Sequence, residues 1–123
     1  IVLLRDPTRG GVATVLNEIS KSARLGIQID QNRLPVKDEV AGACEILGLD
    51  PLYVANEGVF LTIVRPDVAE TVIERIKGFS CGQGATIIGE IGADHPGQVV
   101  MKSGIGGKRV VNMLPGEQLP RIC

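Results

Sequence analysis

The feature that most limits the fold is an amphipathic pattern that begins directly after Gly10-Gly11. Apolar residues recur there with the spacing of one helix face, at Val12, Val15, Leu16, Ile19 and Ala23. Gly26 follows at a position where a left-handed glycine can end the helix. The sequence therefore predicts an amphipathic helix between Gly11 and Gly26 that needs other elements of the chain to cover its apolar face.

Two more helices are predicted further along. One has Val40, Cys44 and Leu47 on its apolar face and is stopped by Gly48. The other runs from Pro66 to Gly78, with charged residues on the face opposite its apolar side chains. Between the two, Asp50-Pro51 combines a helix-capping side chain with a proline suited to the first helical position, so one short helical turn is expected there.

Short apolar runs predict strands between and after these helices: Ile27 to Ile29, 59–64, 86–91, 99–102 and 110–113. The run 59–64 is rich in β-branched and aromatic residues, as in a buried strand. Turn sequences separate the last three strands, so we expect them to form an antiparallel meander. The order of elements predicts an α+β domain with helices packed on a mixed sheet.

Composition excludes several classes of protein. The 123 residues are 44% hydrophobic and 22% charged with a net charge of -1, which gives no basic footprint for nucleic acid or an anionic membrane. No apolar stretch is long enough for a membrane-spanning helix. The 3 cysteines form no CxxC pair, which argues against a disulfide framework or zinc site and favours a reducing cytoplasm. Because the chain starts at Ile1 without a signal pattern, we expect a domain excised from the C-terminal half of a longer protein.

A candidate anion site lies immediately before the first helix, in the residues Asp6, Thr8, Arg9, Gly10 and Gly11. Free backbone N–H groups and the helix dipole favour an anion at a helix N-terminus, and phosphate is the expected ligand. In the alternative interpretation, Asp6 or Thr8 only caps the helix and the glycines ease a tight turn. Both interpretations remain open at this point.

Glu57 is a candidate base, because it stands between Asn56 and Gly58 at the entrance to an apolar run. Partial burial there would raise its basicity for proton abstraction, whereas a solvated loop glutamate is the alternative. The chain has 1 histidine, His95, which we expect on a surface turn. No metal site is predicted from the sequence.

The last ten residues, 114–123, contain two prolines and no periodic pattern, so we expect an extended tail with a reach of roughly 33 Å. Its final residue is Cys123. A thiol at the tip of a mobile tail can enter an active site and leave it with a covalent group, unlike a core cysteine. An accidental cysteine on a disordered end is the alternative.

Three segments together closely resemble the C-terminal half of the HypE family of hydrogenase maturation factors: Arg5 to Gly11, Cys44 to Gly58, and Leu119 to Cys123. The terminal Pro-Arg-Ile-Cys distinguishes that family from its relatives in the aminoimidazole ribonucleotide synthetase superfamily. The resemblance implies a PurM C-terminal-domain-like fold over 1–113, with a three-layer α/β/α arrangement, a mixed sheet and partial ferredoxin-like topology. It also implies that 114–123 is a mobile tail carrying the acceptor cysteine.

The resemblance implies a carbamoyl dehydratase. The full-length protein would use ATP to convert an S-carbamoyl group on Cys123 into a thiocyanate, which supplies cyanide ligands to the iron of NiFe hydrogenase. By the same resemblance, Glu57 is the base, Asn56 orients the amide, and Asp6, Thr8, Arg9, Gly10 and Gly11 contribute to ATP binding.

The resemblance also implies cofactors and partners. ATP and Mg would be bound mainly by an N-terminal domain, so we expect this chain alone not to turn over ATP. The partners would be the carbamoyltransferase HypF, the HypC-HypD complex and a second copy of the full-length protein. Two alternatives stay open: a non-catalytic partner-docking module, and another ATP-dependent phosphotransferase of the superfamily.

Overall fold

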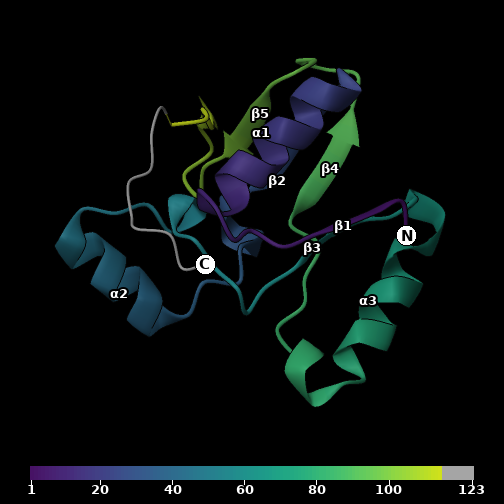
Figure 1. Cartoon of the computed structure of the whole chain (residues 1–123), viewed down its shortest axis with the longest axis horizontal. Coiled ribbons are helices and arrows are strands. Elements are labelled where there is room, and N and C mark those ends of the chain that lie inside the picture. The colour runs from purple at the N-terminus through teal and green to yellow at the C-terminus, as the bar shows by residue number, and fades with distance from the viewer. Residues whose placement is uncertain (115–123) are drawn as a thin grey trace.

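The computed structural model describes residues 1–114 (Figure 1). Of the predicted tail, 114–123, only Leu114 is among the described residues. The rest of the tail, including Cys123, lies outside them. The helices are α1 (Gly11–Ala23), α2 (Asp38–Leu47) and α3 (Ala69–Lys77). The strands are β1 (Leu3–Arg5), β2 (Gly26–Asp30), β3 (Leu61–Ile63), β4 (Gly89–Gly92), β5 (Val99–Lys102) and β6 (Lys108–Val110).

Four of the strands form a mixed sheet in the order β4-β2-β5-β6. β2 runs parallel to β5, whereas the β2–β4 and β5–β6 pairs are antiparallel. The α+β class with a mixed sheet is thereby confirmed. Of the predicted meander of the last three strands, the antiparallel β5–β6 pair is confirmed and the pairing of β4 with β5 is wrong. β2 lies between β4 and β5 because its isoleucines, Ile27 and Ile29, are almost fully buried and belong at the centre of the sheet.

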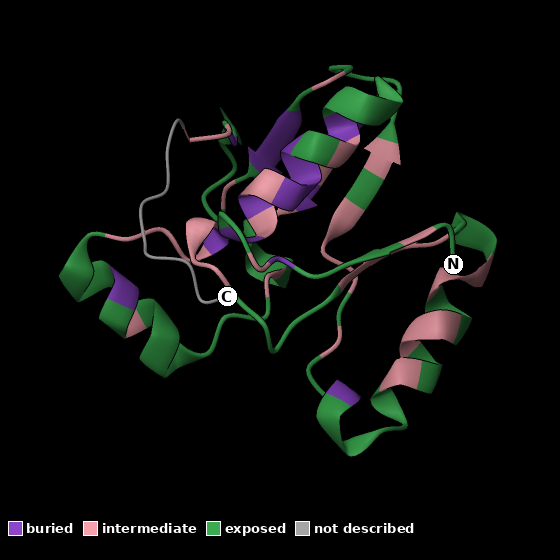
Figure 2. Ribbon diagram, viewed as in Figure 1, coloured by how far each residue is buried: buried purple, intermediate pink, exposed green. Residues whose placement is uncertain are grey.

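Helix α1 lies across this sheet, and Figure 2 shows buried residues concentrated where the two meet. The core cluster consists of Ala13, Leu16, Ile27, Ile29, Leu52, Val99, Met101 and Val111. The predicted helix is confirmed, but its predicted end is wrong. Arg24 adopts the left-handed conformation with φ 55°, and Gly26 belongs to β2. A Cβ on Gly26 would lie 1.6 Å from the Asp94 carbonyl oxygen, so a close backbone approach requires glycine there.

Helices α2 and α3 project away from the four-stranded sheet on opposite sides of the molecule (Figure 1). Both predicted helices are confirmed, and Gly48 caps α2 with φ 66°. Cys44 is the only buried residue of α2, and α3 has none. The expected apolar face of α2 is therefore only partly covered, since Val40 and Leu47 are exposed.

The remaining two strands, β1 and β3, form a separate antiparallel pair in which Leu3 lies opposite Ile63. The predicted buried strand over 59–64 is thus shorter than expected and only half-buried, because within residues 1–114 it pairs with β1 alone. β4 and β6 are each displaced by about two or three residues from their predicted positions. None of the helices in residues 1–114 is long and apolar enough to cross a lipid bilayer.

Candidate functional site

The fold brings together two loops that the sequence singled out separately. The backbone N–H of Asn56 donates a hydrogen bond to the Pro7 carbonyl oxygen at 3.0 Å. Pro7 is almost completely buried, so this contact lies at a fixed point of the structure. The candidate anion loop and the Asn56-Glu57-Gly58 turn are therefore neighbours.

The anion loop ends in two consecutive left-handed residues, Gly10 with φ 60° and Gly11 with φ 65°. Gly10 is the N-cap of α1, and in the described part of the chain no side chain forms a capping hydrogen bond there. The interpretation in which Asp6 or Thr8 caps the helix is therefore wrong. The first-turn N–H groups, together with the helix dipole, remain able to bind an anion.

Gly11 explains why the helix starts where it does. Its α-carbon is buried against the turn η2 (Pro51–Tyr53), and a Cβ would lie 2.4 Å from the Leu52 carbonyl oxygen and 2.7 Å from that of Val54. A side chain at this position would push the two segments apart. Glycine therefore lets the start of α1 sit directly on the backbone that leads into the Asn56 turn.

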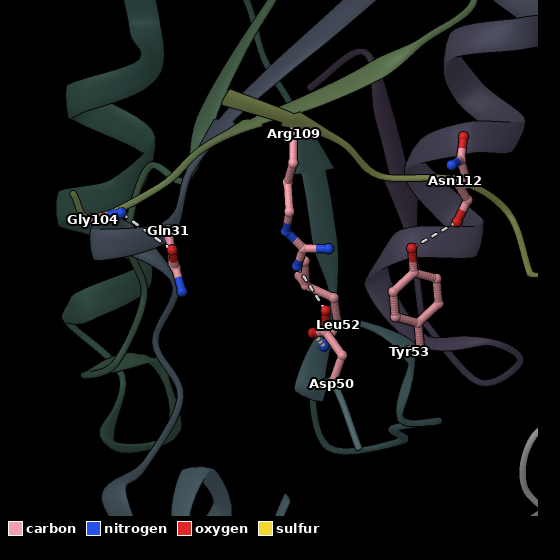
Figure 3. Close-up of polar contacts among 7 residues, drawn as sticks. All are labelled: Gln31, Asp50, Leu52, Tyr53, Gly104, Arg109 and Asn112. Atoms are coloured by element: carbon pink, nitrogen blue, oxygen red, sulfur yellow. Dashed lines mark hydrogen bonds and ion pairs between the residues drawn. The ribbon is translucent and has the colours of Figure 1, made fainter. Parts of the chain in front are cut away.

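The turn η2 is fixed from several sides (Figure 3). The Asp50 carboxylate accepts a hydrogen bond from Leu52 N at 3.0 Å and one from the Arg109 guanidinium at 2.7 Å. The Tyr53 hydroxyl donates to the Asn112 carbonyl oxygen at 2.7 Å. The helical turn predicted from Asp50-Pro51 is confirmed, whereas Tyr53 and Arg109 were not identified from the sequence because their partners are distant along the chain.

The electrostatic environment of Tyr53 differs from that of an exposed phenol. Burial, followed by the negative charge of Asp50, raises the pKa of Tyr53 above its ordinary value of 10.0. The positive charge of Arg109 acts in the opposite direction. The hydroxyl therefore stays protonated, and able to donate its hydrogen bond, throughout the neutral range.

Asn56 and Glu57 lie on the surface. The Asn56 side-chain oxygen accepts a hydrogen bond from Gly58 N at 2.7 Å, which folds residues 56–58 into a tight turn. Of the two alternatives for Glu57, the solvated loop glutamate is confirmed and partial burial is wrong, because the turn projects from η2 and the following Val59 and Phe60 are also exposed. Glu57 is accessible to a ligand rather than enclosed by the domain.

The other candidate residues are placed as follows. Asp6 and Arg9 are exposed and Thr8 is half-buried, all in the loop before α1. Cys44 and Cys81 are both free, the first buried and the second exposed. His95 is exposed in a turn, as predicted. Among residues 1–114, no group of three or more histidine, cysteine or acidic side chains is arranged to hold a metal ion.

The glycine-rich segment 103–107 is the loop of the β5–β6 hairpin. Ser103 N donates to the Gly107 carbonyl oxygen at 2.7 Å, and the Gln31 side chain accepts a hydrogen bond from Gly104 N at 3.1 Å (Figure 3). Because β6 rather than a helix directly follows this loop, it lacks the helix N-terminus with which a phosphate-binding P-loop ends.

Residues 1–102 match the family described as AIR synthase related protein, C-terminal domain, and the chain belongs to this family. It is 51% identical over 123 residues to "Carbamoyl dehydratase HypE" of Rhizobium leguminosarum bv. viciae, covering all of this chain and 35% of that protein. It is 50% identical over 123 residues to the protein of the same name from Bradyrhizobium diazoefficiens, of which it covers 36%. The chain thus spans about a third of the length of these relatives.

Solved structures extend the likeness to three dimensions. A crystal structure of the hydrogenase maturation protein HypE matches with a TM-score of 0.92 and 42% identity, covering 98% of this chain and 40% of that one. HypE in complex with ATP matches with a TM-score of 0.90 and 43% identity, covering 98% and 37%. A HypE-HypF complex matches with a TM-score of 0.84 and 45% identity, covering 89% and 35%.

Proposed function

We propose that this chain is the C-terminal domain of an ATP-dependent carbamoyl dehydratase that acts in hydrogenase maturation. The observation that carries the proposal is the hydrogen bond from Asn56 N to the Pro7 carbonyl oxygen. It joins a helix N-terminus suited to phosphate to an exposed turn that offers a carboxylate and an amide. The similarity to proteins named carbamoyl dehydratase, over the whole of this chain, supports the same reaction.

The proposed reaction needs a phosphate-binding group and a base side by side. The oxygen of an S-carbamoyl group attacks the γ-phosphorus of ATP, ADP leaves, and the oxygen becomes part of a good leaving group. The phosphorylated intermediate loses one of its two nitrogen protons to give a neutral imine, and a base then removes the second proton while the carbon–oxygen bond breaks and phosphate departs. The product is a thiocyanate, S–C≡N, and the carbamoyl oxygen leaves in the phosphate.

We assign the residues of the two loops accordingly. The backbone N–H groups of Gly10 and Gly11, with Arg9, bind phosphate, and Asp6 and Thr8 line the same loop.

On the neighbouring turn, Glu57 is the base and Asn56 orients the carbamoyl amide. The Asn56 oxygen is engaged by Gly58 N, which leaves the amide nitrogen to donate a hydrogen bond to the carbamoyl oxygen. The exposure of the turn gives a carbamoylated cysteine access to Glu57. Cys123, at the end of the tail 114–123, is the proposed carrier.

The proposal includes components outside this chain. ATP and Mg would be bound mainly by the N-terminal domain, and the existence of a solved HypE complex with ATP supports nucleotide binding. HypF would deliver the carbamoyl group, as the solved HypE-HypF complex supports, and the HypC-HypD complex would receive the cyanide. We propose that the full-length protein works as a homodimer in the cytoplasm, where Cys44 and Cys81 remain reduced.

The mass of the C-terminal peptide tests the proposal. Full-length protein would be incubated with HypF, carbamoyl phosphate and ATP, and three forms compared: native, Glu57→Gln, and the control Glu45→Gln, which alters an exposed carboxylate of α2. In the native and control proteins, the carbamoyl adduct on Cys123 should lose one water. In Glu57→Gln it should persist, with dehydration slower by about 10²- to 10⁴-fold. Equal rates would exclude Glu57 as the base, and an unmodified Cys123 would exclude the carrier role.

A further inference from the structure

The chain is held at three consecutive points just before the segment that carries Cys123. Val111 N donates to the Val99 carbonyl oxygen at 2.8 Å, and the Asn17 side chain donates to the Val111 carbonyl oxygen at 2.8 Å. The Tyr53 hydroxyl then donates to the Asn112 carbonyl oxygen at 2.7 Å. The first two bonds belong to the buried core, because Asn17 is 4% exposed and Val111 fully buried.

The bond to Tyr53 is of a different kind, because it lies at the surface rather than in the core. Asn112 is exposed and follows β6, which ends at Val110. Tyr53 is the last residue of η2 and leads directly into the turn that carries Glu57. One phenol thus connects the start of the C-terminal segment to the start of the loop that bears the proposed base (Figure 3).

We infer that Tyr53 is a positioning residue, which holds the origin of the C-terminal segment against η2, the turn that leads into residues 56–58, so that Cys123 reaches Glu57 as an intramolecular substrate. The inference rests on the proposed function. The 11 residues that follow Asn112, 113–123, span at most about 36–40 Å, so the position and direction of their origin limit where the thiol can go.

The expected size of the effect follows from the bond itself. A hydrogen bond at the surface contributes about 1 kcal/mol, and loss of that pre-organisation would reduce the productive population of the segment by about fivefold. Removing the bond lengthens the free segment by only one residue. Loss of the bond therefore acts through the direction in which the C-terminal segment leaves the domain and not through the length of that segment.

The acceptor in this contact is a backbone carbonyl, which provides a matched control. Tyr53→Phe removes the hydrogen bond and keeps the aromatic ring, whereas Asn112→Ala changes the side chain and keeps the carbonyl oxygen. Both variants would be made in the full-length protein. Single-turnover dehydration of carbamoylated Cys123 should slow by about fivefold in Tyr53→Phe and stay at the native rate in Asn112→Ala.

The KM for ATP distinguishes a positioning role of Tyr53 from a distortion of the site caused by the substitution. A positioning residue changes the rate and leaves the KM for ATP unaltered, whereas displacement of η2 would move the start of α1 and raise that KM. Equal dehydration rates in the Tyr53→Phe and native proteins, or a raised KM, would overturn the inference.

Hydrogen exchange tests the same contact without turnover. The backbone N–H of Val111, which donates to the Val99 carbonyl oxygen next to this contact, should exchange faster in Tyr53→Phe than in the native protein or Asn112→Ala, and unchanged exchange would overturn the inference. Absence of thiocyanate in the native protein would instead refute the proposed function.

Discussion

Helix α1 and the outer helices α2 and α3 have the same kind of amphipathic pattern but very different environments. Six residues of α1 are buried, against one in α2 and none in α3. The difference arises because α1 lies on the four-stranded sheet, while α2 and α3 project from it (Figures 1 and 2). Apolar spacing therefore predicts that a helix forms, whereas its contribution to stability depends on whether a sheet faces it. Both candidate loops are attached to the region around α1.

The largest expected effect concerns the start of α1. Gly11→Ala should destabilise the chain by about 3–5 kcal/mol, because a Cβ there meets the Leu52 and Val54 carbonyl oxygens and φ is 65°. The control is Gly42→Ala in α2, where no atom beyond the neighbouring residues and the nearby backbone of the same helix lies within 4 Å of the added Cβ. That control should stabilise the chain by about 0.5–1 kcal/mol. Urea unfolding of the two variants measures the contrast, and similar free energies of unfolding would contradict it.

The next effect concerns a buried polar side chain of α1. Asn17→Ala should cost about 2–3 kcal/mol, because Asn17 donates to the Ala13 and Val111 carbonyl oxygens at 2.9 Å and 2.8 Å in the core. The neighbouring Glu18→Ala is the control, since its ion pair with Arg5 is exposed and should contribute less than about 0.5 kcal/mol. Thermal unfolding distinguishes the two, and equal losses would mean that the contacts of Asn17 contribute little.

The sequence specified local features better than distant contacts. The periodicity after Gly10-Gly11 predicted α1, and Asp50-Pro51 predicted η2, because both depend on neighbouring residues. The position of β2 between β4 and β5 was missed, because strand pairing depends on residues far apart in the sequence.

The same limit applies to the site. Motifs identified both candidate loops, but the bond from Asn56 to Pro7 and the contacts of Tyr53 and Arg109 join distant segments. No local pattern encodes such contacts. The sequence left open whether Glu57 is partly buried or solvated, because an apolar run follows it. The solvated alternative is confirmed, since that run pairs only with β1 in the described residues.

A smaller effect tests the attachment of η2 to the region around α1. Tyr53→Phe should cost about 1 kcal/mol at neutral pH through loss of the bond to Asn112. Because the folded-state pKa of Tyr53 is raised by burial and by Asp50, the folded state favours the protonated phenol. The stabilisation that comes from the protonated phenol is fully present below the ordinary pKa of 10.0. It is lost as the pH rises through the raised pKa of the folded state.

Urea unfolding at about pH 8 and about pH 11 checks this prediction. The native chain should lose more stability between the two pH values than Tyr53→Phe does, so the difference between them should shrink at the higher pH. Asn112→Ala should follow the native chain, because it keeps the carbonyl acceptor. Parallel pH profiles for native and Tyr53→Phe chains would show that ionisation of this phenol is not linked to folding.

The smallest expected effect lies on α2. Ile46 is 86% exposed, so Ile46→Ala should change the free energy of unfolding by less than about 0.5 kcal/mol. The corresponding truncation on α1, Leu16→Ala, should cost about 2–5 kcal/mol, because Leu16 is 6% exposed and belongs to the core cluster. Both changes shorten an aliphatic side chain of the same size to a methyl group, and urea unfolding of the two variants compares their surroundings directly. A loss of 1 kcal/mol or more at Ile46 would mean that α2 packs its outer face in solution, and the contrast between α1 and the outer helices would then not hold for α2.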